Sequence, residues 1–535
     1  MKIYYLLISI VLLATTFPNE AFSQKKDYGK VNGSVDSQSG YYFEGSDNSA
    51  GLGQTGFATN TYLNLGYTFK RFNAGLQYEI YEPPLVGYSP HLKGNKLMMG
   101  FAEYLSPKFS ARLGNMYEQF GSGLVFRAYE DRTLGFNNSL LGVNLRYSPV
   151  SSVQLKLIAG APRKFLKYID TRVYGADATV GLLSLMGVES DASWNVGGSW
   201  VKRDDNSKTH IELYPRDVNL YSVRSNFNKG IFTLGAEYAT KSQALFSSAE
   251  TGFNNVKGNV LLANFGLSAS GIGGTLDFRR VESFQVNVDD VIGKEFVAFN
   301  FVPALTKQHK YTLAALFPHR LIGVGEIGGQ MELFSSITID EEEFRELSLS
   351  LNASRYNALV EKGEGEGYKF IDFGGKVLFE ELGLEAQYPF SDKFEATVGY
   401  VYQKNEEFSR LGFGQMVISS QTVIGDLLYR FNDKHSLRME LQHQWSTSKD
   451  DQRWALGLLE YGFAPKLMIY GSLMSNYQTE GEATLYYTAG ASYNFSRLRL
   501  SLGVNRVRAG YLCSGGVCRY VPEHSGAILS VNYSF

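Results

Sequence analysis

The sequence predicts an all-β protein folded as a single large antiparallel transmembrane β-barrel. Three observations predict this class: apolar and polar residues alternate in many segments of about ten residues, short and long polar connections alternate between these segments, and the chain ends on an aromatic residue. The composition agrees, because 56 of 535 residues are Gly and 14 % are aromatic, and Gly and Tyr are poor helix formers.

Charge and cysteine content exclude several other classes. The net charge is −2, which gives no electrostatic case for binding nucleic acid. Two cysteines in 535 residues exclude a disulfide-rich scaffold, an iron–sulfur protein and a zinc-finger array.

Residues 1–23 are predicted to be a secretory signal peptide, with residues 24–535 forming the barrel as one domain. Lys2 supplies the positive start, residues 3–14 form the apolar core, and Ala21 and Ser23 are the small residues before a cleavage site at Gln24. The alternative is an uncleaved anchor, but the core of about 12 residues is shorter than the roughly 20 that span a bilayer. We therefore expect export and location in the cell outer membrane, among its lipids.

The C-terminal segment shows the strand pattern most clearly. In residues 526–535 (GAILSVNYSF) the odd positions carry Ala, Leu, Val, Tyr and Phe, and the even positions are small or polar except Ile528. Alternate side chains of a strand face opposite sides, so one face is expected to meet lipid and the other a polar lumen. The terminal Phe535 resembles the C-terminal signature of bacterial outer-membrane barrels, which implies an assembly signal read by the barrel-assembly machinery.

The same alternation recurs upstream, for example in residues 394–402, 422–445 and 484–505. Short turns such as 70–71 and 496–497 alternate with long polar loops such as 119–137 and 509–525. We expect about 26 strands, within a range of roughly 22 to 26. The weakest stretch is 286–344, where Pro303, Pro318 and an acidic run interrupt the pattern.

The segment 117–138 (YEQFGSGLVFRAYEDRTLGFNN) is the most distinctive loop. It begins apolar and ends dense in charge, and a solvated loop needs no Leu-Val-Phe run. A barrel this wide is usually obstructed, so we expect the loop to fold into the lumen. Predicted lumen or constriction residues are Arg127, Glu130, Asp131 and Arg132 on the loop, with Glu118, Arg112 and Arg146 near it; Glu118 and Arg146 are the expected partners of opposite sign.

This stretch, together with Gly160, Ala161 and Pro162, resembles a family of outer-membrane β-barrels of uncharacterised function from the Bacteroidota. The resemblance implies the location and the fold. It transfers no activity, cofactor or site residue.

Cys513 and Cys518 are separated by Ser-Gly-Gly-Val in the last long loop, which the expected topology places outside the cell. That compartment is oxidising, and Gly-Gly allows tight closure, so a disulfide is predicted. A metal site would need more ligands, and only His524 is near. We expect no metal and no cofactor.

The predicted function is a passive pore or transport channel partly closed by an inserted loop. The alternative is a structural or scaffold barrel, a subunit of a secretion or assembly complex. A weaker alternative is a barrel enzyme, but the chain has no H-E-x-x-H pair and no G-x-S-x-G elbow, so we expect no enzymatic activity.

Overall fold

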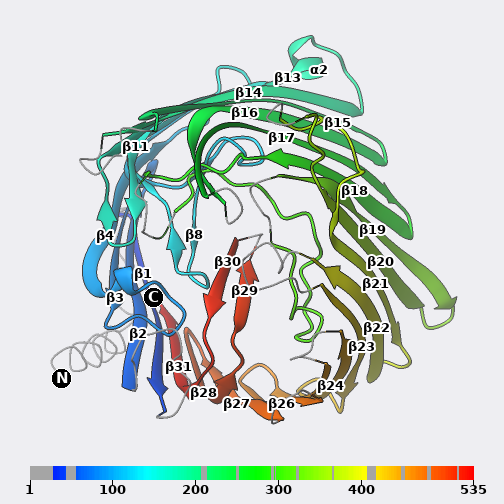
Figure 1. The fold of residues 1–535 in the computed structure, drawn as a ribbon. Coiled ribbons are helices and arrows are strands. Elements are labelled where there is room, and N and C mark those ends of the chain that lie inside the picture. The colour runs from blue at the N-terminus through cyan, green and yellow to red at the C-terminus, as the bar shows by residue number, and fades with distance from the viewer. Residues whose placement is uncertain are drawn as a thin grey trace.

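The computed structural model describes residues 28–43, 56–206, 214–248, 252–290, 295, 297–320, 325–363, 367–406, 417–447, 452–478, 483–514 and 517–535. Over these ranges the chain is a closed β-barrel with several segments folded inside the ring of strands (Figure 1). Residues 1–23, the expected signal peptide, lie outside the described residues. Among the described residues, no helix combines the length and the apolar composition needed to cross a membrane.

Within the described chain, 24 long strands pair in sequence order, each antiparallel to its neighbours, and β1 pairs with β31 to close the ring. The wall strands are β1 (Lys30–Tyr42), β2 (Gly56–Phe69), β3 (Phe72–Tyr81), β4 (Gly94–Leu105), β5 (Phe109–Met116), β10 (Leu140–Tyr147), β11 (Val153–Lys164), β13 (Thr171–Gly181), β14 (Ala192–Asp205), β15 (Asp217–Lys229), β16 (Phe232–Ser248), β17 (Gly252–Ala269), β18 (Ile272–Glu282), β19 (Gly325–Asp340), β20 (Arg345–Ala358), β21 (Val377–Pro389), β22 (Phe394–Asn405), β23 (Ile418–Arg430), β24 (His435–Ser446), β25 (Arg453–Phe463), β26 (Leu467–Gln478), β27 (Thr484–Phe495), β28 (Leu498–Val507) and β31 (His524–Ser534).

The remaining elements are short and lie in the connections: η1 (Pro90–Leu92), β6 (Glu118–Gln119), β7 (Arg127–Ala128), β8 (Glu130–Asp131), β9 (Phe136–Asn137), β12 (Lys167–Tyr168), α2 (Leu182–Leu185), β29 (Gly510–Ser514) and β30 (Val517–Val521).

Alternation along each strand separates the two faces of the wall. In β24 the side chain of Leu441 is 55 % exposed, whereas its neighbours Glu440 and Gln442 are buried toward the lumen. Only a closed barrel satisfies all its strand hydrogen bonds internally, which is what lipid requires of strands that cross it. The apolar outer face and the closed ring therefore define a transmembrane barrel, as the sequence predicted.

Aromatic side chains gather beside the short turns. Phe72, Trp194, Phe390 and Tyr493 are exposed there, and they flank turns at the end of the barrel that also holds the start of β1 and the C-terminal residue. Aromatic rings favour the boundary between lipid and water, so this row marks one membrane interface.

The expected short turns at 70–71 and 496–497 lie at one end of the barrel, and long connections such as 117–139 lie at the other, although the connection between β13 and β14 at the short-turn end is also long. The 24 observed strands fall within the expected range. The sequence predicted about 26 strands, and the excess lies in the stretch where the alternation was interrupted. Between β18 and β19, the described residues of 283–320 contribute no strand to the wall. They enter the lumen instead.

Candidate functional site in the barrel lumen

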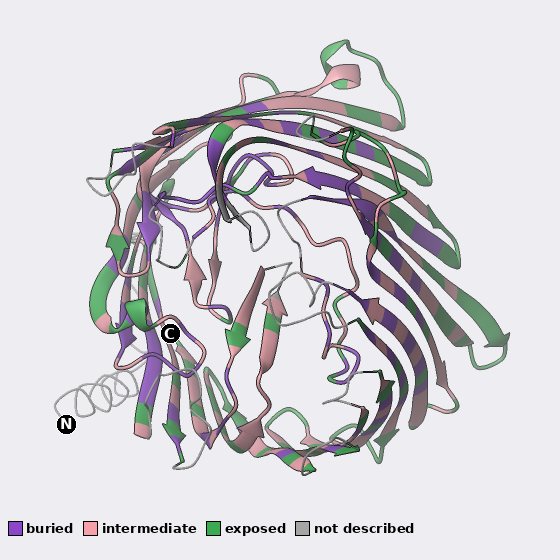
Figure 2. Ribbon diagram, in the orientation of Figure 1, coloured by how far each residue is buried: buried purple, intermediate pink, exposed green. Residues whose placement is uncertain are grey.

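Four connections from the long-loop end fold into the lumen. They are residues 82–93, 117–139 and the described parts of 283–320 and 508–523, and all lie inside the ring of strands in Figure 1. Figure 2 shows buried residues on segments such as 117–139 and on the wall strands beside them, whereas the hairpin β29–β30 is intermediate to exposed. The candidate site is the space that these inserted segments leave open.

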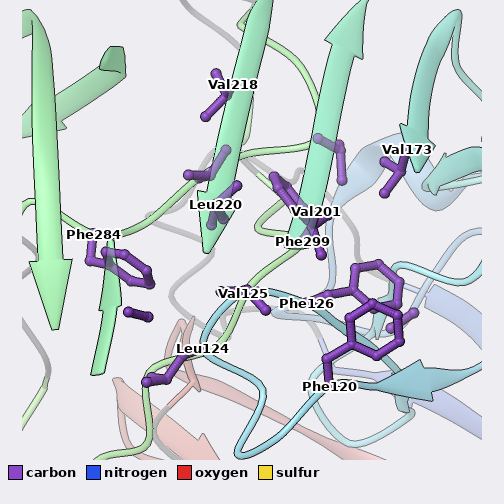
Figure 3. Close-up of a cluster of buried hydrophobic side chains, with 14 of the residues drawn as sticks. Phe120, Leu124, Val125, Phe126, Val173, Val201, Val218, Leu220, Phe284 and Phe299 are labelled. Carbon is purple, nitrogen blue, oxygen red and sulfur yellow. The ribbon is translucent and has the colours of Figure 1, made fainter. Parts of the chain in front are cut away.

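The apolar half of segment 117–139 packs on the lumen wall. Phe120, Leu124, Val125 and Phe126 are fully buried, and they belong to one cluster with inward-facing residues of β13, β14 and β15 (Figure 3). The wall residues of this cluster that are labelled in Figure 3 are Val173, Val201, Val218 and Leu220. Apolar side chains on the lumen face of a barrel need a cover against water, and the Leu-Val-Phe run provides it.

A glycine turn brings this segment against β16. Gly121 has a φ of +54°, and a Cβ there would lie 2.6 Å from Glu237 Oε1. The next amide, Ser122 N, donates to Glu237 Oε2 at 2.9 Å. The turn needs glycine both for its backbone conformation and for this close approach.

Segment 283–320 packs against segment 117–139 through the main chain. Arg127 N donates to Phe299 O at 3.0 Å, and Phe301 N donates to Gly123 O at 3.0 Å. Asn300 Nδ2 adds bonds to Leu124 O and Phe284 O, both at 3.0 Å. These contacts satisfy backbone groups that lie outside the barrel sheet, so the two segments pack together as one folded body.

Charged and buried polar contacts tie segment 283–320 to opposite sides of the wall. Near β11 and β14, Lys164 Nζ lies 2.7 Å from Asp289 Oδ1, and Arg203 Nη1 lies 2.7 Å from Asp290 Oδ1. Across the lumen, His309 Nε2 lies 2.8 Å from Glu381 Oε2 of β21.

At the same far wall, Leu313 bonds to two side chains of β24. Its amide donates to Gln442 Oε1 at 2.9 Å, and Gln444 Nε2 donates to its carbonyl at 2.7 Å. The segment therefore crosses the lumen. Sequence reasoning missed this role, although Pro303, Pro318 and the lost alternation were the signals for it.

The charged half of segment 117–139 faces β1 and β3. Arg132 Nη1 lies 2.8 Å from Asp36 Oδ2, and its Nε lies 3.2 Å from Glu130 Oε2. Glu130 also accepts from Gln77 Nε2 at 3.2 Å. Asp131 Oδ1 accepts from the amide of Leu134 at 3.1 Å and so shapes the turn.

Arg127 makes no ion pair among the described residues. Its guanidinium lies over the rings of Tyr129 and Phe301, at 4.2 and 4.1 Å from their centres. The four predicted residues thus lie inside the barrel, but their partners are Asp36, Gln77 and aromatic rings rather than Glu118 or Arg146.

Glu118 forms a separate cluster with β10 and β11. Arg146 Nη2 lies 2.7 Å and Lys156 Nζ 3.1 Å from its carboxylate, and Asn144 Nδ2 donates to it at 2.9 Å. Burial opposes ionisation, but these partners outweigh it and lower the pKa of Glu118 below its ordinary value. Arg112 lies on β5, opposite Asn144 in the strand pairing, with its guanidinium 3.7 Å from the ring centre of Phe101.

Some other lumen charges pair between neighbouring strands. Arg438 of β24 contacts Asp426 of β23 at 2.9 Å and Glu460 of β25 at 2.7 Å. This pairing keeps charges of both signs on the wall and neutralises Arg438 there.

The hairpin β29–β30 is closed by a disulfide between Cys513 and Cys518. It folds into the lumen (Figure 1), whereas the sequence had suggested a loop outside the cell. Arg519 Nε donates to Thr133 O at 3.0 Å, which joins the hairpin to segment 117–139. Its packing against other inserted segments, which local sequence does not encode, accounts for the difference.

Phe535 lies at the seam where the barrel closes. Its amide donates to Gly33 O at 3.0 Å, and its carbonyl accepts from Gly33 N at 3.1 Å. Its ring lies beside Gly33 and pairs with Tyr533 at a centroid distance of 6.0 Å. The last residue is therefore part of the closing strand pair.

Two cavities remain between the inserted segments. The first has a volume of about 530 Å³ and is lined by Tyr62, Tyr129, Glu130, Asp131 and Arg132, among others, so charges of both signs face it. Arg163 also lines it, in a buried pair with Glu79 at 2.6 Å. The second has a volume of about 570 Å³ and lies between the hairpin, residues 309–316 and the wall strands β25 to β28. Arg519 and Tyr88 line both.

Within the described ranges, no group of three or more His, Cys, Asp or Glu side chains is arranged to hold a metal ion.

The fold defines a large transmembrane β-barrel with several of its connections folded inside the ring of strands. A family model matches residues 1–535, and the chain belongs to that family, which is described as a family of unknown function (DUF6029). The Bacteroidota origin stays a prediction. No curated protein matches the chain.

Solved structures of similar shape include the siderophore receptor PirA from Pseudomonas aeruginosa, at 10 % identity over 96 % of this chain and 81 % of that chain, with a TM-score of 0.43. The translocation pore of the P pilus usher PapC has 9 % identity over 94 % and 99 % of the two chains and a TM-score of 0.44. The copper transporter OprC has 10 % identity over 97 % and 82 % and a TM-score of 0.42.

Proposed function

We propose that this protein is an outer-membrane transport channel whose lumen is narrowed by inserted segments and which solutes cross passively. The closed ring and its apolar outer face support the membrane location, because large barrels of this kind are built into outer membranes. Its partners would be outer-membrane lipids and, through Phe535, the barrel-assembly machinery. We propose transport and no catalytic activity.

One observation carries the transport proposal: the inserted segments leave cavities of about 530 and 570 Å³ within the lumen. Binding sites for small molecules commonly have volumes of this order. A barrel that served only as a scaffold would have no need for polar and aromatic cavities along its interior.

Planar-bilayer recording tests the proposal. Purified protein should give discrete conductance steps, and protein boiled before reconstitution should give none, because boiling unfolds the barrel. Complete absence of steps from protein that still migrates as a folded barrel in unboiled SDS gels would contradict the channel and favour the scaffold.

A further inference from the structure

All the charged residues that line the second cavity are positively charged. Its charged lining residues among the described ranges are Lys310, Arg506, Arg508 and Arg519, and two histidines, His309 and His524, also face it. No Asp or Glu lines it. The first cavity is different, because Glu130, Asp131 and Glu295 line it beside its arginines. The two spaces therefore differ in charge although they share Arg519.

Some of this charge is compensated just outside the lining. Arg506 Nη2 lies 2.8 Å from Glu523 Oε1, and Lys310 Nζ lies 3.4 Å from Glu385 Oε1. Arg508 lies 5.3 Å from the ring centre of Trp454. Arg519 differs from Arg506 and Lys310 in this respect.

Arg519 makes no ion pair with any described residue. Its Nε donates to Thr133 O, its guanidinium lies 3.9 Å from the ring centre of Tyr88, and its buried Nη1 has no hydrogen-bond partner. Burial lowers the pKa of this guanidinium below its ordinary value, more than Tyr88, Tyr42 and Asp131 raise it. Arg519 is half-buried, and the nearby carboxylate of Asp131 compensates its charge only in part, so a bound anion would compensate the rest.

We propose that the second cavity binds a small organic anion, whose carboxylate or phosphate group is held by Arg519 and Arg508. A guanidinium presents paired N–H donors that match the geometry of either group. The tyrosines of the lining, including Tyr42, Tyr88 and Tyr486, offer flat surfaces for the rest of the solute. This inference rests on the proposed transport function: the anion that binds here would be the class of solute that the channel carries.

The test measures binding in non-ionic detergent, so it does not depend on conductance. Benzoate and phenyl phosphate are titrated into the full-length protein by calorimetry, with benzyl alcohol as the neutral probe. At least one of the two anions should bind saturably at one site, and the alcohol should not. Which anion binds more tightly separates a carboxylate site from a phosphate site.

Arg519→Gln should weaken anion binding about tenfold or more, and Arg508→Gln should weaken it as well. Arg499→Gln is the matched control, because Arg499 is exposed on β28 and lines neither cavity. Each variant is first checked as a folded barrel by its migration in unboiled SDS gels. Binding of neither anion, or equal losses in the Arg519 and Arg499 variants, would overturn the proposal. Anion binding without conductance would instead retain the site and reject the channel.

Discussion

Arg203 of β14 and Asp290 of the segment between β18 and β19 form a buried pair, with Nη1 and Oδ1 2.7 Å apart. Arg203 also donates to Asn287 O at 3.1 Å. An arginine that faces the lumen is thus neutralised by a chain segment that is not part of the wall. Such a pair is costly to break from one side, because the remaining charge stays buried. It therefore fixes the inserted segment at one end.

Asp290→Asn is expected to release this end of the segment. Removing one partner of a buried pair typically costs about 3 to 5 kcal/mol, and the loss here falls on the segment rather than on the ring of strands. Hydrogen exchange should accelerate in residues 284–290 and 297–302 and stay slow in β14. Asp372→Asn, which breaks an exposed pair with Lys369, is the control and should change neither. Unchanged exchange near Asp290 would show that the pair is not an anchor.

Phe126→Ala tests the apolar body inside the lumen. Phe126 is fully buried, and truncation of a buried Phe typically costs about 3 to 5 kcal/mol. Segment 117–139 should become accessible to added protease while the barrel stays intact. Phe390→Ala is the matched control, because Phe390 is exposed beside a short turn at the other end. Equal protease resistance in both variants would contradict the packing described.

The cysteines give a chemical test of the hairpin. Without reductant, alkylation followed by mass spectrometry should label neither Cys513 nor Cys518, and with reductant it should label both. Because the bridge closes a loop with a sequence separation of only 5, Cys513→Ser together with Cys518→Ser should cost about 2 kcal/mol or less. Free thiols in protein from native membranes would rule out the disulfide.

Deletion of Phe535 tests the seam and the assembly signal together. The deletion removes two main-chain bonds to Gly33 and one aromatic ring from the closing strand. Export should continue while the amount inserted in the outer membrane falls. Phe495 is exposed beside a turn and away from the seam, so Phe495→Ala serves as the control. Normal insertion without Phe535 would reject the signal.

The strands of the wall could be predicted because the residue pattern within each strand determines which side chains face lipid and which face the lumen. Alternation in segments such as 422–445 sets which face meets lipid, and β23 and β24 have that pattern with Leu441 outward and Gln442 inward. Strand pairing then follows from sequence order, since each short turn makes neighbours of consecutive strands.

The interior could be predicted only in part. An apolar run in a polar loop indicated that residues 124–126 pack away from water, and they are buried in the lumen. The partners were not predictable, because Asp36, Phe299 and Asp290 are far from the loop in sequence and meet it or its neighbours only after the ring closes. The crossing segment 283–320 was visible only as a failure of alternation.

The most direct test of an obstructed lumen is the single-channel conductance of a variant in which residues 122–136 are replaced by a short Gly/Ser linker. A matched replacement of residues 182–190, in a connection at the short-turn end, is the control. If segment 117–139 narrows the lumen, the replacement of 122–136 should give a larger conductance and the replacement of 182–190 the wild-type value, with both variants still folded as barrels. An unchanged conductance after replacement of 122–136, together with cleavage of this segment by extracellular protease on intact cells, would contradict it.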